Sequence, residues 1–255
     1  MKKGYNCEIS HDAYFAEGLD IEIGDNVYIG PKVRIVGNGR VKIGDYTKIH
    51  EDCLILALKY VEIGHNCWFG ERCVIDGSGG IKIGNNVGVG VASQLYSHVA
   101  HGDVLEGCQI FGHKELTIDD DAWLVGMCLV SPVHIGKKSV AYLGSVVTKD
   151  MNENSVYAGV PAIDITKKVG QPWQTRNPKE KLMMFHELLN DFKLSDPSFN
   201  STCIIPVIEW PNELVESISY FNVVTREYTK RLSANEIKFM KWLTSWKGRF
   251  IPLNV

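Results

Sequence analysis

Two histidines, His98 and His101, stand three residues apart in the segment LYSHVAHGD, which covers residues 95 to 103. A neutral imidazole accepts a proton readily near neutral pH, because its ordinary pKa is about 6.5. Histidines close together can also bind a metal ion. Asp103 and Glu106 follow closely and could orient an imidazole ring. These residue types predict acid–base catalysis or metal binding, and the surrounding elements must position them for one or the other.

The segment interrupts a repeat with a period of 20 residues. Within each repeat a large apolar residue returns every six positions, as Ile23, Ile29 and Ile35 do in the first. Neither a helix nor a simple strand has that period. The four aligned stretches are IEIGDNVYIGPKVRIVGNGR from Ile21, VKIGDYTKIHEDCLILALKY from Val41, VEIGHNCWFGERCVIDGSGG from Val61 and IKIGNNVGVGVASQLYSHVA from Ile81.

Each six-residue unit also carries a small or β-branched residue four positions after its large one, such as Val27 or Cys53. Three such units make one triangular coil, with the large and small residues facing inward. Glycines at 24, 44, 64 and 84 are expected to relieve tight corners. Stacked coils bury an apolar column that a single coil cannot shield. The repeat therefore predicts a triangular prism.

The pattern resumes after the histidine segment and then ends. A second block contains Ile118 and Ile135, 17 residues apart instead of 20. This step indicates that the two-residue corner insert is absent there, and the block is one residue shorter between Trp123 and Ile135 than even six-residue units would require. We therefore expect an inserted loop at about residues 98 to 115. The six-residue units stop near Val156, so the expected domains are residues 1 to 170, the prism, and residues 171 to 255, a small α+β appendage.

The appendage has its own pattern of elements. Residues 177 to 192 read as an amphipathic helix, and residues 203 to 210 and 218 to 231 read as strands. A second helix is expected after Ser233, which forms a capping-box pattern with Glu236. The appendage could cap the end of the prism, bind a partner or shape the substrate site.

Composition narrows the classes of partner. The net charge of −3 includes no basic excess, so we expect no nucleic-acid partner. No apolar run approaches about 18 residues, so we expect no membrane insertion and a cytoplasmic location. Seven cysteines form an odd set without a CxxC pair, which argues against disulfides and a thiolate zinc site. No metal is expected.

The repeats, the histidine segment and above all IGKKSVAYLGSVVTKDMNENSVYAGVPA (135 to 162) resemble the hexapeptide-repeat acyltransferases, in their sugar and xenobiotic O-acetyltransferase branch. The resemblance covers about residues 5 to 168. It implies an all-β fold, a left-handed parallel β-helix, which is an exception to the usual crossover handedness. It also implies a homotrimer whose active sites lie between neighbouring prisms, with acetyl-CoA as the acyl donor.

The resemblance also implies roles for individual residues. The general base would be His98 or His101, with His113 as a third candidate, and the spacing does not choose between the first two. A backbone N–H near Gly126 could stabilise the oxyanion, and a lysine suits a phosphate. The expected acetyl-CoA-binding residues are Gly126, Ser145, Thr148, Lys149, Gly159 and Pro161.

The acceptor is left open by the sequence. We favour acetylation of a sugar or saccharide hydroxyl in surface-polysaccharide biosynthesis. An N-acetyltransferase acting on a nucleotide-linked amino sugar is the main alternative. Two further alternatives are a zinc enzyme like the hexapeptide carbonic anhydrases, with His98, His101 and His113 as ligands, and a non-catalytic scaffold.

Overall fold

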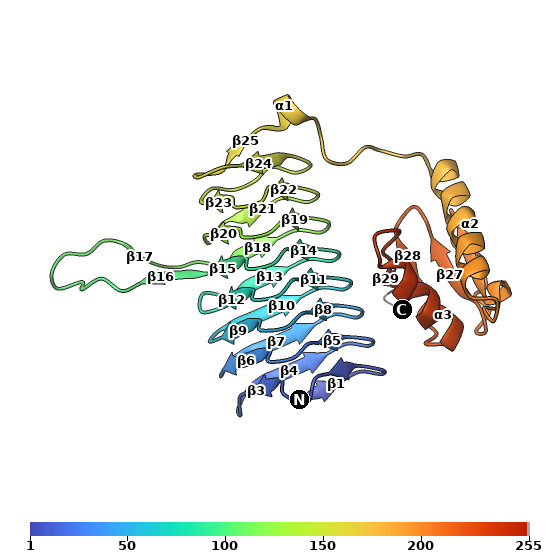
Figure 1. Cartoon of the computed structure of the whole chain (residues 1–255), viewed down its shortest axis with the longest axis horizontal. Coiled ribbons are helices and arrows are strands. Elements are labelled where there is room, and N and C mark those ends of the chain that lie inside the picture. Colours follow the sequence, from blue (N-terminus) through green and yellow to red (C-terminus); the bar gives the residue numbers. More distant parts are fainter. Residues whose placement is uncertain (254–255) are drawn as a thin grey trace. The chain divides into compact units, whose positions relative to one another are not determined.

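The computed structural model of the chain describes residues 1–253 and divides it into two compact units (Figure 1). The first unit is Met1–Trp173 and the second is Gln174–Val255. The first carries the repeats and the histidine segment, so it positions the candidate site.

The first unit consists of three parallel sheets that the chain visits in turn. Sheet A contains β1 (Lys2–Lys3), β4 (Asp20–Ile23), β7 (Arg40–Ile43), β10 (Tyr60–Ile63), β13 (Ile81–Ile83), β18 (Leu116–Ile118) and β21 (His134–Ile135). Sheet B contains β2 (Glu8–Ile9), β5 (Tyr28–Ile29), β8 (Lys48–Ile49), β11 (Trp68–Phe69), β14 (Gly88–Val89), β19 (Trp123–Leu124), β22 (Val140–Ala141), β24 (Val156–Ala158) and the antiparallel β25 (Ile163–Asp164). Sheet C contains β3 (Tyr14–Phe15), β6 (Arg34–Gly37), β9 (Leu54–Ala57), β12 (Val74–Asp76), β15 (Gln94–Tyr96), β20 (Leu129–Val130) and β23 (Val146–Val147). The predicted parallel β-helix is confirmed.

The inward positions are those that the six-residue period predicts. In sheet B, Ile29 pairs with Ile49, and Ile49 pairs with Phe69, one coil apart each time. All three side chains are fully buried. The small positions, including Cys53 and Cys73, are buried beside them. Each fully buried aliphatic side chain contributes about 1.5–3 kcal/mol, so the continuous column is what holds the coils together.

The corner glycines act through close approach rather than through backbone torsion. A Cβ on Gly44 would lie 2.5 Å from the carbonyl carbon of Gly64 in the next coil. At these corners the left-handed φ values fall on the residue two positions after the glycine, such as Asn26 with φ 56° and Asn66 with φ 56°. The glycines therefore lie at tight corners, as expected. They are needed because the next coil stacks too close to leave room for a Cβ.

The second block continues the same prism. Ile83 pairs with Ile118, and Ile118 pairs with Ile135, so the 17-residue step keeps the register. The strands β1, β2 and β3 add one coil before the first repeat that the sequence pattern identifies. At the other end, β24, β25 and the short helix α1 (Thr166–Val169) close the unit.

Between β15 and β18 the chain leaves the prism as an antiparallel hairpin, which projects to the left in Figure 1. Its strands are β16 (His98–Ala100) and β17 (Phe111–His113). The inserted loop expected at about residues 98 to 115 thus has regular structure at its base. We call this segment, residues 98 to 113, the hairpin.

The second unit has α2 (Pro178–Ser195), the 3₁₀ turn η1 (Ser201–Cys203), β26 (Ile204–Val207), β27 (Ser219–Asn222), β28 (Glu227–Tyr228), α3 (Ala234–Leu243) and β29 (Ile251–Pro252). Phe185 of α2, Phe221 of β27 and Phe239 of α3 pack together in its core. The strand expected over residues 218 to 231 is interrupted by a turn and forms two antiparallel strands. No helix in residues 1–253 is long and apolar enough to span a bilayer.

Glu236 corrects one detail of the predicted capping box. The Ser233 side chain caps α3 by accepting from the backbone N–H of Glu236. The Glu236 carboxylate, however, accepts from the Ser219 hydroxyl and from the backbone N–H groups of Arg231 and Leu232. Glu236 is thereby buried and ties α3 to the strands instead of completing the box.

Candidate active site

The base of the hairpin brings two histidines together. His98 in β16 pairs across the strands with His113 in β17, and their rings stack with centroids 5.6 Å apart. His98 is the point at which the chain leaves sheet C, two residues after the end of β15. The backbone of the prism therefore fixes the position of the His98 Cα, from which the imidazole projects.

Asp76, at the end of β12 in the preceding coil, lies against His98. The Nδ1 atom of His98 is 3.2 Å from Oδ2 of Asp76, within ion-pair distance although the ring is not turned into hydrogen-bond alignment. The side chain of Asp76 is 9% exposed and that of His98 is 30% exposed. Because Nδ1 is itself buried, the solvent-facing part of the ring is the part away from Nδ1.

Two serines hold Asp76 and the hairpin base in place. Ser78 donates to Oδ1 of Asp76 through its backbone N–H at 3.0 Å and its hydroxyl at 2.6 Å. Ser97 donates its hydroxyl to the Asp76 carbonyl at 2.6 Å and accepts from the N–H of Gly79 at 2.8 Å. The carboxylate that lies against His98 is thus itself anchored by hydrogen bonds.

The carboxylates proposed from sequence proximity do not have this role. Asp103 is exposed in the hairpin, and its side chain accepts from the backbone N–H of Leu105 at 2.9 Å. Glu106 and His101 are also exposed. Asp76 was missed because it precedes His98 by a whole coil. The 20-residue period was the signal that could have found it, because positions 76 and 96 stack in register.

The return strand of the hairpin has a separate anchor. Glu115, just after β17, accepts from the Tyr60 hydroxyl and lies 3.2 Å from the ammonium of Lys82. Lys82 also lies over the Tyr60 ring, 5.6 Å from its centroid. This cluster attaches the return strand of the hairpin to β10 and β13 of sheet A.

The residues expected to bind acetyl-CoA fall on two different edges of the prism. Gly126 and the Gly159–Pro161 turn lie at the corner between sheets B and C, the B–C edge. Thr148 and Lys149 lie at the corner between sheets C and A, the C–A edge, where the chain also leaves at His98. The two sets are separated by the width of sheet C, so a single chain does not gather them in one groove.

The residues of these two sets differ in whether a ligand could contact them. The backbone N–H of Gly126 donates to no partner among residues 1–253, whereas its carbonyl accepts from the N–H of Gly144 at 2.9 Å. Thr148 and Lys149 are exposed. Ser145 is fully buried and its hydroxyl faces the prism interior. Ser145 therefore packs as a small inward residue, with no side-chain atom at the surface.

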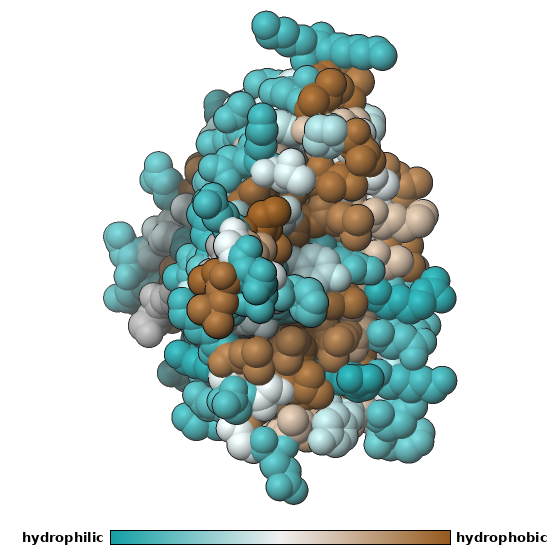
Figure 2. Space-filling view, turned by 90° about the vertical axis from the view of Figure 1, so that its left-hand side faces the viewer, coloured by the Kyte–Doolittle hydropathy of each residue, from teal (hydrophilic) through white to brown (hydrophobic). Residues whose placement is uncertain are grey.

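The face between these two edges is apolar in its upper part. Figure 2 views the molecule from the side on which the hairpin projects and shows apolar surface over the last coils. Exposed side chains of these coils include Leu129 at 42%, Leu143 at 60% and Val160 at 74%. An apolar patch of this kind marks a binding surface for a ligand or another chain.

In the part of the chain that the structure describes, the hairpin histidines belong to no group of three or more side chains with metal-ligand proximity. Among the described residues, the group with metal-ligand proximity is His50, Glu51 and Glu71, which belongs to different coils. His98 and His113 are stacked face to face, and His101 lies beyond the end of β16. The arrangement at the hairpin base is a histidine within ion-pair distance of a buried carboxylate, which suits proton transfer.

Comparison with known proteins agrees with the resemblance. No family model matches the chain. A galactoside O-acetyltransferase of Escherichia coli (strain K12) is 27% identical over 159 residues, 62% of this chain and 59% of that enzyme. The chain therefore matches less than two thirds of the length of this relative. The predicted resemblance to the hexapeptide-repeat acyltransferases is confirmed by this similarity.

Solved structures share the fold. The polySia-specific acetyltransferase NeuO has a TM-score of 0.50 and 19% identity, covering 76% of this chain and 94% of that chain. A hexapeptide-repeat-containing acetyltransferase from Vibrio cholerae O1 biovar eltor, complexed with acetyl coenzyme A, has a TM-score of 0.39 and 22% identity, covering 58% of this chain and 69% of that chain. The likeness to NeuO shows that the three-sheet prism is a fold that acetyltransferases use.

Proposed function

We propose that the protein transfers an acetyl group from acetyl-CoA to a hydroxyl of a sugar or saccharide, with His98 as the general base. The observation that carries the proposal is the contact between His98 and the buried Asp76 at the point where the hairpin leaves the prism. The galactoside O-acetyltransferase relative supports a saccharide hydroxyl as the acceptor. Synthesis of a surface polysaccharide is the setting we favour.

His98 would act through the nitrogen away from Asp76. It accepts the proton of the acceptor hydroxyl while that oxygen attacks the thioester carbonyl. The resulting imidazolium is stabilised by the Asp76 carboxylate and returns the proton to the departing sulfur as the carbon–sulfur bond breaks. The N–H of Gly126, which donates to no partner among residues 1–253, is the donor we assign to the oxyanion.

The complete site requires two chains. His98 and Lys149 lie on the C–A edge, whereas Gly126, Gly159 and Pro161 lie on the B–C edge. If the C–A edge of one prism faces the B–C edge of its neighbour, the base and the donor groups meet in one groove. Closed threefold symmetry repeats this contact three times. The apolar patch at Leu129 and Leu143 supports such an association.

Binding of the donor tests the proposal directly. Calorimetric titration with acetyl-CoA, repeated with CoA alone, should give one site per chain in both cases. Lys149→Ala should weaken both ligands by a similar factor, because the side chain is assigned to a phosphate that both carry. Absence of binding at millimolar concentration would leave the scaffold alternative in place of an enzyme.

Mixing of two inactive variants tests the shared site. His98→Ala damages the C–A edge, and Gly126→Trp blocks the B–C edge. Co-expressed at equal amounts, the two chains should restore about one quarter of the unmodified activity. In randomly mixed trimers about half of the C–A edges and about half of the B–C edges are intact, so about a quarter of the shared sites have both. Each variant expressed alone should be inactive. Absence of restored activity in mixed oligomers would contradict a site shared between chains.

The acceptor class is tested by product analysis. Incubation with acetyl-CoA and a panel of saccharides and nucleotide-linked amino sugars should yield acetyl esters, which mild alkali removes. Amides survive the same treatment. An alkali-stable product would assign the protein to the N-acetyltransferase alternative.

A further inference from the structure

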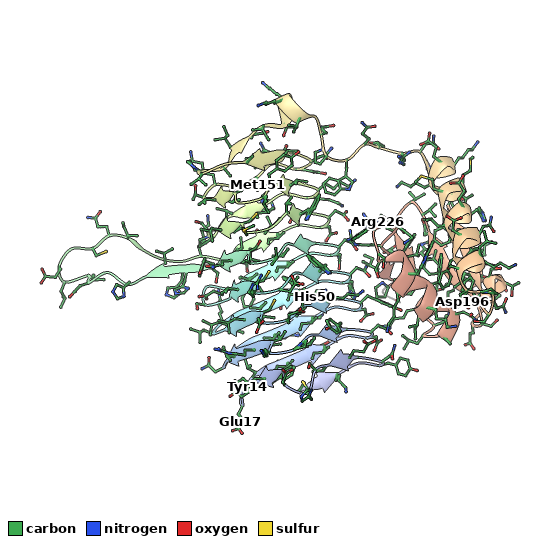
Figure 3. All side chains as sticks on the ribbon, in the orientation of Figure 1. Tyr14, Glu17, His50, Met151, Asp196 and Arg226 are labelled. Atoms are coloured by element: carbon green, nitrogen blue, oxygen red, sulfur yellow. The ribbon has the colours of Figure 1, made fainter. Side chains whose placement is uncertain are left out.

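We propose that His50, Glu51 and Glu71 form a binding site for a divalent transition-metal ion, for which zinc is the best fit. One ligand atom from each residue lies within 4.8 Å of the others. The site is on the B–C edge of the N-terminal coils, after β8 and β11, and is separate from the hairpin (Figure 3). It is independent of the proposed acetyl transfer.

The two glutamates are stacked by the fold itself. They are 20 residues apart and occupy the same corner position in consecutive coils, as the hydrogen bond from the N–H of Arg72 to the carbonyl of Glu51 shows. Like charges placed side by side in this way repel each other. Among residues 1–253, neither carboxylate has a Lys or Arg partner within ion-pair distance. A bound cation would remove the repulsion.

The outer face of sheet A avoids such stacks. On the outer face of sheet A, consecutive coils place Lys2 beside Glu22, Glu22 beside Lys42, and Lys42 beside Glu62. Glu62 in turn pairs with Lys82. Charges of opposite sign therefore alternate along that face. The pair at Glu51 and Glu71, with the His50 imidazole beside it, departs from this alternation.

His50 is held in a defined orientation. Its ring lies between those of Tyr28 and Trp68, with centroids 5.5 Å and 5.3 Å away. Its Nε2 atom is buried and has no hydrogen-bond partner, while Nδ1 lies 3.8 Å from Oε2 of Glu51. The nitrogen that faces the carboxylates is therefore Nδ1. A rigid imidazole leaves only the two glutamate side chains to adjust.

The donor set selects the class of ion. One imidazole nitrogen and two carboxylate oxygens suit zinc, which binds such atoms at about 2.0–2.2 Å and holds neighbouring ligands about 3.4 Å apart in a tetrahedron. The glutamates must therefore close by about 1 Å, which half-exposed side chains can do by rotation. Two negative charges match the charge of the ion, and the fourth position is open to water.

Metal binding by the full chain tests the site. Protein stripped with a chelator is dialysed against zinc chloride, and bound metal is counted by mass spectrometry. The unmodified chain should hold one zinc that Glu71→Gln and Glu51→Gln both lose. Glu62→Gln, which alters a glutamate of the alternating face, and His98→Asn, which alters the hairpin, should both retain it. Equal zinc retention in Glu71→Gln and the unmodified chain would overturn the proposal.

Thermal unfolding gives a second readout. A stabilisation that depends on both zinc and Glu71 would not arise if Glu71 had only a structural role. Without metal, Glu71→Gln should unfold about 1–3 °C higher than the unmodified chain, because it removes the repulsion. With zinc at about 100 times its dissociation constant, the unmodified chain should gain several degrees. Glu71→Gln should gain none. An equal rise in both proteins would place the zinc elsewhere and contradict the site.

Discussion

His98 Nδ1 lies 3.2 Å from Oδ2 of Asp76, although the two residues belong to consecutive coils of the prism. Asp76 is held by Ser78 and by Ser97, the residue directly before His98. The imidazole is therefore placed by the backbone, next to an anchored carboxylate. Among the described residues, no carboxylate lies within ion-pair distance of the exposed His101.

The first prediction separates the two histidines. His98→Ala should lower kcat by about 10²–10⁴-fold, the usual contribution of a general base, while acetyl-CoA affinity stays unchanged. His101→Ala should retain activity within about a factor of two, because its side chain is exposed beyond the end of β16. Release of CoA thiol measures turnover, and calorimetry measures affinity. The opposite pattern would assign the base to His101.

The second prediction concerns Asp76 as a positioning residue. Asp76→Asn keeps the size of the side chain but removes the charge that stabilises the imidazolium. We expect kcat to fall by about 10–100-fold with an unchanged KM for acetyl-CoA. Asp76→Glu should recover part of the loss, because it restores the charge at a shifted position. A variant that raises KM and leaves kcat intact would show that Asp76 contributes only to the shape of the groove.

The third prediction tests the reason for the corner glycines. Gly44→Ala places a Cβ 2.5 Å from a carbonyl carbon of the next coil, so the stack must open. We expect a loss of about 1–3 kcal/mol in the free energy of unfolding. The matched control is Gly112→Ala in β17, where a Cβ meets nothing within 4 Å; it should change stability by less than about 0.5 kcal/mol. Urea unfolding compares the two, and equal effects would refute the stacking argument.

The fourth prediction concerns pH and Glu236. Burial raises the pKa of the Glu236 carboxyl, although the hydrogen bonds from Ser219 and from the N–H of Arg231 act in the opposite direction. A raised folded-state pKa favours the protonated form in the folded unit. The associated stability is therefore present below the ordinary glutamate pKa and is lost as pH rises through the folded-state value.

Circular dichroism checks this dependence, because nearly all helical residues lie in α2 and α3 of the second unit. The urea midpoint of the helical signal should fall as pH increases from about 4 to about 7. Glu236→Gln should remove that part of the dependence, because its side chain stays neutral. A Glu236→Gln midpoint that falls equally with pH would assign the effect to other groups.

The sequence by itself determined which residues lie inside the prism. Large residues at every sixth position, such as Ile49 and Phe69, can all be buried only if the chain turns in triangular coils and the coils stack. That requirement is local and repeats every 20 residues, so the period predicts the core, the corners and the register of the coils before the hairpin. The register after the hairpin, where Ile83 pairs with Ile118, came from the structure. The period also located the break at which His98 leaves the prism.

The tertiary structure decided which side chains face one another at the corners. Stacking brought Asp76 to His98 and Glu51 to Glu71 from one coil away, while Asp103, closer in sequence to His98, lies out along the hairpin. It also divided the expected acetyl-CoA residues between two edges, with Gly126 on one and Lys149 on the other. Corner contacts depend on the path of the whole coil, because each turn of the chain must close before neighbouring corners can meet.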